Sequence, residues 1–149
     1  MSTFQPIDNP QLAVLGGGAW GTALASVVAR HHNKPVTLWA REAETVAAIN
    51  NRHENDLFLP GIALPESISA TQHLAELAAS DIILMVVPAQ FARAALAELA
   101  PLMKADASLV LCAKGIEQSS LSLMSDVAGD FMAPAQIAVL SGPSFAADV

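Results

Sequence analysis

Three glycines near the amino terminus have the residue type and spacing of an anion-binding turn. Gly16, Gly18 and Gly21 follow the pattern G-x-G-x-x-G, between an apolar run at 12–15 and a segment whose apolar residues recur with a helical period. The first glycine lets the chain leave a strand sharply, and the second lets backbone N–H groups approach a pyrophosphate. The third lets the following helix lie close to the sheet, with its positive N-terminus toward the anion. We therefore predict a dinucleotide site; a glycine turn that serves only the fold is the alternative.

Lys114 is the lysine best placed to reach such a ligand. In an open α/β sheet, ligands bind in the crevice beyond the carboxyl ends of the strands. Lys114 directly follows the apolar run at 108–113, so we expect its side chain in that crevice. Lys34 and Lys104 each precede a predicted strand and are expected at the opposite edge. The alternative for Lys114 is a solvated surface cation.

The end of the second predicted strand bears on the choice between NAD and NADP. Enzymes that prefer NAD usually carry an acidic residue there, which accepts hydrogen bonds from the ribose 2′-hydroxyl. This chain has Ala40 at that position, followed by Arg41, which could pair with a 2′-phosphate. Glu42 could instead serve the 2′-hydroxyl, or it could simply begin a helix. We expect NADP to be favoured, with NAD as the alternative and the use of both left open.

Four further residues stand where a strand or the first helix would present them to a ligand. Trp20 occupies a variable position of the glycine motif, where it either lines the site or packs on the helix. Pro88 ends a buried strand, and the backbone there could line the nicotinamide or a ribose. Gly142 and Ser144 follow the last predicted strand, so they form either a second anion-binding corner or an ordinary turn with a helix cap.

Strand-like and helical segments alternate along the chain. Strands are predicted at 11–16, 35–40, 68–70, 81–87, 108–113 and 136–140, helices at 19–31, 42–50, 90–100 and 120–128, and a helical turn near 74–79. This alternation predicts a Rossmann-like α/β fold with a doubly wound, mainly parallel sheet. We assign residues 1–10 to an N-terminal extension and 11–149 to the NAD(P)-binding domain. Residues 141–149 have the pattern of a strand end, a turn and the start of a helix, so we expect a fragment of a longer enzyme.

Composition and charge narrow the classes of function. The 149 residues are 53% hydrophobic and 14% charged, which is typical of a parallel sheet covered on both faces. The net charge of −7 argues against a nucleic-acid partner or an anionic membrane surface. No apolar run is long enough for a membrane helix, so membrane insertion is not expected.

The remaining reactive side chains indicate neither a metal site nor a thiol nucleophile. Cys112, the single cysteine, lies in an apolar run and is expected to be an inert buried thiol. His53 and His73 lack recognisable catalytic partners, and no Cys/His or carboxylate cluster has the spacing of metal ligands. The first ten residues contain no hydrophobic signal segment. Together with the cysteine usage, this leads us to expect a cytoplasmic protein.

Five motifs occur in the order found in one known family. The chain resembles the amino-terminal half of bacterial NAD(P)-dependent glycerol-3-phosphate dehydrogenases over nearly the whole sequence after Gln11. The lysine-glycine motif joined to the serine-glycine-proline motif is far more specific than the glycine turn. The motifs are G-G-G-A-W-G-T-A-L-A at 16–25, L-W-A-R at 38–41, F-L-P-G-I with L-P at 58–65, A-K-G-I-E at 113–117 and L-S-G-P-S-F-A at 140–146.

The resemblance implies reversible hydride transfer between NAD(P)H and dihydroxyacetone phosphate, giving sn-glycerol 3-phosphate for phospholipid synthesis. It implies that Lys114 contacts the substrate, borders the cofactor and acts in catalysis by stabilising negative charge on the substrate oxygen. Where the family usually has a serine after its valine-proline pair, this chain has Ala89. By position, the resemblance implies further cofactor contacts at Ala19, Trp20, Arg41 and Ala146, and further substrate contacts at Gly142 and Ser144.

The resemblance also implies a missing half. In this family a mostly helical second domain carries the general acid–base lysine and much of the substrate-phosphate site, and these residues contain none of it. We therefore expect the chain to bind cofactor with little or no turnover alone, and a homodimer of the full-length enzyme is left open. Two other interpretations remain: a related two-domain dehydrogenase of another hydroxy acid or sugar nucleotide, and a non-catalytic dinucleotide-sensing module.

Overall fold

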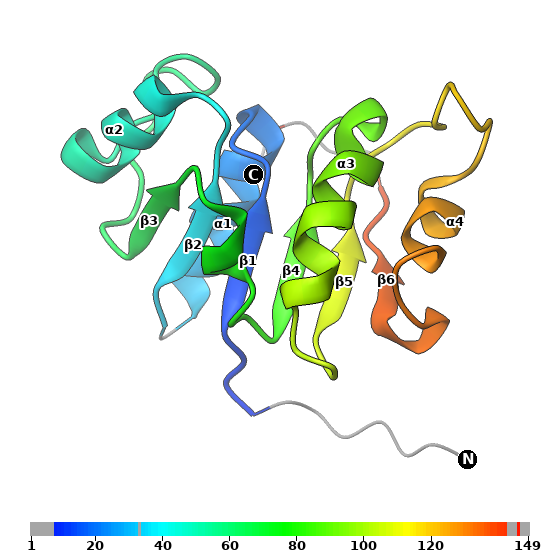
Figure 1. Ribbon diagram of the computed structural model, residues 1–149. Coiled ribbons are helices and arrows are strands. Elements are labelled where there is room, and N and C mark those ends of the chain that lie inside the picture. The colour runs from blue at the N-terminus through cyan, green and yellow to red at the C-terminus, as the bar shows by residue number, and fades with distance from the viewer. Residues whose placement is uncertain (1–7, 33, 143–145, 147–149) are drawn as a thin grey trace.

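The chain folds around a parallel β-sheet. The structure, a computed structural model, describes residues 8–32, 34–142 and 146. The sheet has six strands in the order β3-β2-β1-β4-β5-β6, and each neighbouring pair is parallel (Figure 1). This confirms the predicted Rossmann-like α/β class. The strands are β1 (Leu12–Leu15), β2 (Val36–Trp39), β3 (Ile68–Thr71), β4 (Ile82–Met85), β5 (Ser108–Leu111) and β6 (Ile137–Val139).

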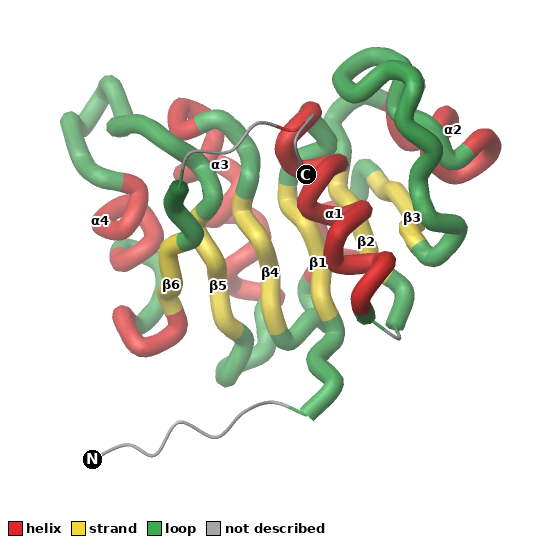
Figure 2. The backbone as a smooth tube through the Cα atoms, turned by 180° about the vertical axis from the view of Figure 1, so that it is seen from behind, coloured by secondary structure: helices red, strands yellow, loops and turns green. Residues whose placement is uncertain are grey.

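Helices cover both faces of the sheet. Figure 2 shows α1 on one face, and Figure 1 shows α3 and α4 on the other with η1. The α-helices are α1 (Ala19–His31), α2 (Ala43–Arg52), α3 (Ala89–Leu99) and α4 (Met124–Gly129), and the 3-10 turns are η1 (Leu74–Leu77), η2 (Ala100–Leu102) and η3 (Pro134–Gln136). No helix in the described ranges is both long enough and apolar enough to cross a membrane.

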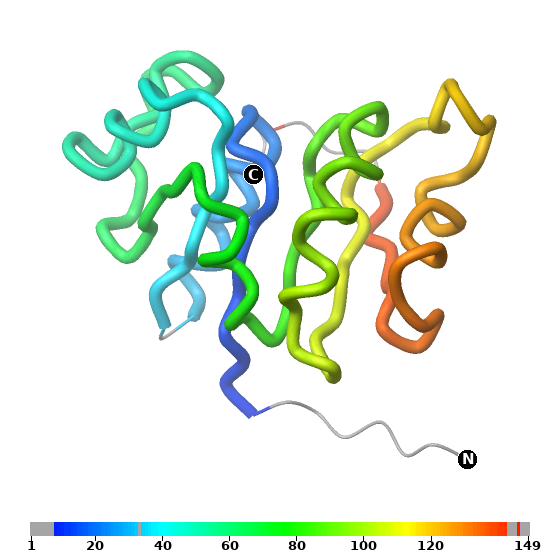
Figure 3. Tube along the Cα trace, in the orientation of Figure 1, coloured from blue at the N-terminus to red at the C-terminus, as the bar shows by residue number. Residues whose placement is uncertain are grey.

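The direction of winding reverses between β1 and β4. The first half of the chain adds β2 and β3 on one side of β1, and the second half adds β4, β5 and β6 on the other (Figure 3). At such a switch point the connections after the two central strands diverge, which opens a crevice at their carboxyl ends. The topology therefore places a ligand site beyond β1 and β4.

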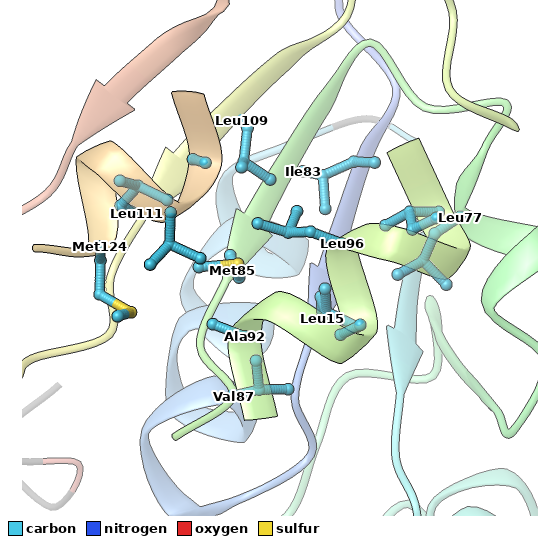
Figure 4. Packing of buried hydrophobic residues seen from close by; sticks show 14 of the residues in the cluster. Leu15, Leu77, Ile83, Met85, Val87, Ala92, Leu96, Leu109, Leu111 and Met124 are labelled. Atoms are coloured by element: carbon cyan, nitrogen blue, oxygen red, sulfur yellow. The ribbon is translucent and has the colours of Figure 1, made fainter. Parts of the chain in front are cut away.

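Strand residues alternate between two apolar cores. In β1, Ala13 and Leu15 face the α3 side, whereas Val14 faces the α1 side. Figure 4 shows Leu15, Ile83 and Met85 meeting Leu96 of α3. Burial on both faces explains why the central strands β1 and β4 are continuous apolar runs rather than alternating ones.

One predicted helix is wrong at its start. We predict a helix near 120–128, but α4 begins only at Met124. The preceding residues form a loop, in which Ile116 and Leu123 make an antiparallel bridge and Leu121 has a φ of 58°. Glu117, at 4% exposure, accepts hydrogen bonds from the Ser120 hydroxyl and, at 2.9 Å, from Nε of Arg93 in α3, which anchors this loop to the core. The tertiary anchoring of Glu117 thus overrides the local helical pattern.

Candidate functional site

A crevice lies at the carboxyl ends of the central strands. Its larger part is a cleft of about 530 Å³ and its smaller part a hollow of about 290 Å³. Trp20, Val86, Val87 and Pro88 line both, so the two parts meet at the carboxyl end of β4. The larger cleft brings together seven residues predicted from the sequence, namely Gly16, Gly18, Ala19, Trp20, Gly21, Arg41 and Pro88. The smaller hollow adds Lys114.

The glycine turn has the close contacts that a dinucleotide site needs. A Cβ on Gly21 would stand 1.8 Å from the carbonyl oxygen of Gly16, so only glycine lets α1 approach β1 this closely. Gly16 has a φ of +130°, and a Cβ there would stand 2.8 Å from the Val87 nitrogen. A Cβ on Gly18, by contrast, would meet nothing within 4 Å, so this glycine faces open space at the N-terminus of α1. The turn therefore fits a pyrophosphate, with the N-terminal N–H groups of α1 as donors.

Arg41 lines the larger cleft, beside two partners. Its Nη2 is 3.0 Å from Glu42 Oε1, and its Cζ lies 5.6 Å from the ring centroid of Phe91. The Arg41 side chain is 70% exposed, so it remains accessible to a ligand although its charge is paired. Gln72 holds the backbone by donating from Nε2 to the Arg41 carbonyl at 2.7 Å. Both charged groups considered for the ribose thus stand side by side at the cleft.

Lys114 lines the smaller hollow and contacts the segment that follows β6. Its Nζ donates a hydrogen bond to the Gly142 carbonyl at 3.2 Å, which brings two predicted substrate contacts together. The loop that carries Lys114 packs on α3, where a Cβ on Gly115 would stand 3.4 Å from the Ala89 Cβ. Gln90 secures the same loop by donating to the Ile116 carbonyl at 2.9 Å. Lys114 is thereby held in the crevice.

Two other predicted site residues are less well defined. Ser144 lies outside the described residues, so its predicted role as a substrate contact or helix cap stays a prediction. Ala146 is half-buried, and the residues on either side of it are not described. Its predicted cofactor contact also stays a prediction.

Lys104 and Cys112 lie where the sequence predicts. Lys104 pairs with Asp81 at 2.6 Å, at the amino ends of β4 and β5 and away from the crevice. The Lys104 ammonium holds the pKa of the Asp81 carboxyl below its usual value. Cys112 is buried, and desolvation raises the pKa of its thiol to about 11. A thiol with this pKa is almost entirely protonated at neutral pH, which agrees with an unreactive group.

Sequence reasoning missed Asn55 and Phe91. Asn55 is 1% exposed, and its Nδ2 donates to the Gly17 carbonyl at 2.9 Å and to Thr22 Oγ1 at 2.7 Å. Phe91 lines the larger cleft opposite Arg41. Neither residue belongs to a local motif, because Asn55 lies 38 positions from Gly17 and Phe91 stands in an ordinary amphipathic helix. Only the fold reveals that they touch the site.

Comparison with known proteins finds relatives that carry the name glycerol-3-phosphate dehydrogenase. The glycerol-3-phosphate dehydrogenase [NAD(P)+] of Caulobacter vibrioides is 60% identical over 139 residues, which make up 93% of this chain and 42% of that protein. The enzyme of the same name from Parvibaculum lavamentivorans is 55% identical over 93% of this chain and 41% of its own length. The crystal structure of glycerol-3-phosphate dehydrogenase from Coxiella burnetii matches 94% of this chain and 43% of that one, with 32% identity and a TM-score of 0.83.

These relatives extend well beyond the matched region. The chain spans about 42% of the length of the Caulobacter relative. A family model described as the N-terminus of NAD-dependent glycerol-3-phosphate dehydrogenase matches residues 11–149. With its glycine turn, its crevice at the β1–β4 switch point and this match over nearly its whole length, the chain belongs to the family of NAD-dependent glycerol-3-phosphate dehydrogenase N-terminal domains.

Proposed function

We propose that this chain is the NAD(P)-binding half of an enzyme that transfers hydride between NAD(P)H and dihydroxyacetone phosphate. The product, sn-glycerol 3-phosphate, would serve phospholipid synthesis in the cytoplasm. The crevice carries the proposal, because it joins the glycine turn at one end to Lys114 at the other across the carboxyl end of β4. The names of the relatives support the choice of substrate.

Different residues of the crevice are proposed to bind different parts of the dinucleotide. The backbone of the glycine turn and the first turn of α1 receive the pyrophosphate, because Gly18 leaves open space there. Trp20 and Pro88 line both parts of the crevice and so flank the path between the two ends of a dinucleotide. When bound, the nicotinamide supplies the hydride that the carbonyl carbon accepts. These contacts orient the cofactor and exclude water from its path.

Lys114 is proposed to act on the oxygen of the reacting carbonyl. As the carbon accepts hydride, negative charge develops on this oxygen, and a nearby ammonium stabilises that charge. The Gly142 carbonyl, 3.2 Å from Nζ, directs the ammonium and leaves its other N–H groups free for the substrate. The oxygen finally takes one proton. By the family resemblance, the lysine that delivers it belongs to a second domain, so we expect the chain alone to bind cofactor with little turnover.

Arg41 and Glu42 are proposed to set the cofactor preference together. A 2′-phosphate can recruit the Arg41 guanidinium away from Glu42, whereas a 2′-hydroxyl can donate to the Glu42 carboxylate. Because the two side chains pair at 3.0 Å, each cofactor must compete for one of them. We propose that NADPH binds more tightly than NADH and that both are accepted.

Titration of the chain with NADPH and with NADH, followed by tryptophan emission, tests this proposal. Both tryptophans of the chain, Trp20 and Trp39, line the larger cleft, so emission should report occupancy. We expect saturable binding of both cofactors, tighter for NADPH. Failure of a folded chain to bind either cofactor would contradict the proposal. Normal steady-state turnover of dihydroxyacetone phosphate by the chain alone would contradict the dependence on a second domain.

A further inference from the structure

A buried asparagine bonds to the glycine turn on the side that faces the protein interior. Asn55 follows α2, and its Nδ2 donates to the carbonyl of Gly17 at 2.9 Å and to Thr22 Oγ1 at 2.7 Å. Its Oδ1 accepts a hydrogen bond from the N–H of Phe58 at 3.3 Å. Because the Gly17 carbonyl requires a donor and the Phe58 N–H an acceptor, the orientation of the Asn55 amide is determined by its partners.

These contacts set the direction of one peptide group. The Gly17 carbonyl accepts from Asn55 and also from the Thr22 hydroxyl at 3.4 Å, so its oxygen points into the protein. Asn55 and Thr22 are 1% and 0% exposed. In a planar trans peptide the C=O and N–H bonds point in opposite directions. The N–H of Gly18 is therefore directed away from the interior, on the side where Gly17 and Gly18 line the larger cleft.

We propose that Asn55 is a positioning residue, which holds the Gly17–Gly18 peptide so that the Gly18 N–H can donate to the cofactor pyrophosphate. A peptide between two glycines has little restraint of its own, because neither residue has a Cβ. A donor that is oriented before binding avoids the cost of ordering it on binding. This inference rests on the proposed binding of NAD(P).

The same residue joins a second wall of the cleft to the turn. The Asn55 side chain accepts from the Phe58 N–H, and its backbone carbonyl accepts a hydrogen bond from the Leu59 N–H at 2.8 Å. Phe58 lines the larger cleft. Asn55 thus fixes the position of the segment after α2 relative to the glycine turn, so these two walls of the cleft are held at one separation.

The Asn55→Asp variant tests the positioning role. A carboxylate of the same shape can still accept from the Phe58 N–H, but it cannot donate to Gly17, and its charge repels the Gly17 carbonyl. We expect the Kd for NADH to rise roughly 10- to 100-fold, the range for loss of a hydrogen bond to a charged group. In ¹⁵N–¹H spectra, the Gly18 amide signal should shift on NADH binding in the parent chain and lose that response in the variant.

Asn50 offers a matched control. Its Nδ2 donates to the Ala70 carbonyl at 2.9 Å and its Oδ1 accepts from the Ala70 N–H at 2.7 Å, against β3 rather than the turn. Asn50→Asp also removes an amide donor from a backbone carbonyl, but we expect its NADH affinity to stay within about twofold of the parent, as for a distant site. An equal loss of affinity in both variants would overturn the positioning role.

Two Thr22 variants serve if Asn55→Asp does not fold. Thr22→Val removes the hydroxyl that bonds Asn55 and Gly17, and it should weaken NADH binding, whereas Thr22→Ser should restore the affinity. If Asn55→Asp or Thr22→Val binds NADH as tightly as the parent chain does, and its Gly18 amide signal still shifts on binding, the inference is overturned. The proposed function is still supported in that case, because the parent chain binds the cofactor. If the folded parent binds neither NADH nor NADPH, the proposed function fails, and this inference fails with it.

Discussion

The guanidinium of Arg93 makes a bidentate ion pair with the carboxylate of Glu117. Its Nε lies 2.9 Å from Oε1 and its Nη2 2.9 Å from Oε2, while Nη1 reaches Asp130 at 2.7 Å. Arg93 belongs to α3, and Glu117 lies three residues after Lys114. This pair therefore fastens the loop that carries Lys114 to a helix of the core.

Acid stability should depend on this pair. Arg93 and the Ser120 hydroxyl lower the pKa of Glu117 below its usual value of 4.5. Because the folded-state pKa lies below the unfolded one, the carboxylate stabilises the fold fully above about pH 4.5 and loses this effect as the pH falls through the folded pKa. We expect Glu117→Gln to lower the thermal midpoint at pH 7 and to flatten its decline below pH 4.5, followed by circular dichroism. The control Asp130→Asn leaves the Glu117 contacts in place, so its thermal midpoint should decline below pH 4.5 as the parent's does. If the midpoint of Glu117→Gln declines as steeply, the acid sensitivity does not come from Glu117.

Two glycine-to-alanine substitutions should behave differently. In Gly21→Ala the new Cβ would meet the Gly16 carbonyl oxygen at 1.8 Å, so α1 must move away from β1. We expect a loss of about 1–3 kcal/mol in the free energy of unfolding, or more, together with weak cofactor binding. In Gly129→Ala the new Cβ meets nothing within 4 Å at the end of α4, so we expect stability unchanged or raised by up to about 1 kcal/mol. Urea unfolding of both variants measures the difference, and equal effects would count against the close approach.

Cofactor preference should respond to Arg41 and Glu42 in opposite ways. Arg41→Ser should weaken NADPH binding by roughly tenfold or more, since a charge-assisted hydrogen bond to the 2′-phosphate is lost. It should leave NADH binding nearly unchanged. Glu42→Gln frees the guanidinium, which is 3.0 Å away, and should favour NADPH further while weakening NADH. Tryptophan-emission titrations of both variants give the ratios; a similar loss for both cofactors in Arg41→Ser would refute the 2′-phosphate contact.

Cys112 should react slowly with thiol reagents. With a pKa of about 11, only one thiol in roughly a thousand is ionised at pH 8. An unfolded cysteine, with a pKa near 8.5, is about one-quarter ionised at this pH. We expect iodoacetamide to alkylate the folded chain at least about a hundredfold more slowly than the chain in denaturant, measured by mass spectrometry. Comparable rates in the two states would show that the thiol is neither desolvated nor shielded.

Local sequence patterns predicted most of the secondary structure. The helix at 19–31 is confirmed at both ends, and the six predicted strands all occur. They succeed because strands buried on both faces and helices with one apolar face leave short-range patterns. The predicted start of α4 is wrong, because Glu117 bonds Arg93 of α3 and no local pattern reports that contact.

Residue types and their spacing predict which chemistry is available, namely a glycine turn for an anion, Arg41 beside Glu42, and Lys114 at the end of a strand. Which of these groups meet depends on the packing of strands and helices that are far apart in the sequence. Placing β4 beside β1 joins the glycine turn to the hollow that Lys114 lines, and the return of the chain after α2 sets Asn55 under Gly17. Contacts between residues far apart in the chain depend on strand order and helix packing, whereas residue spacing reports only the neighbours within one element.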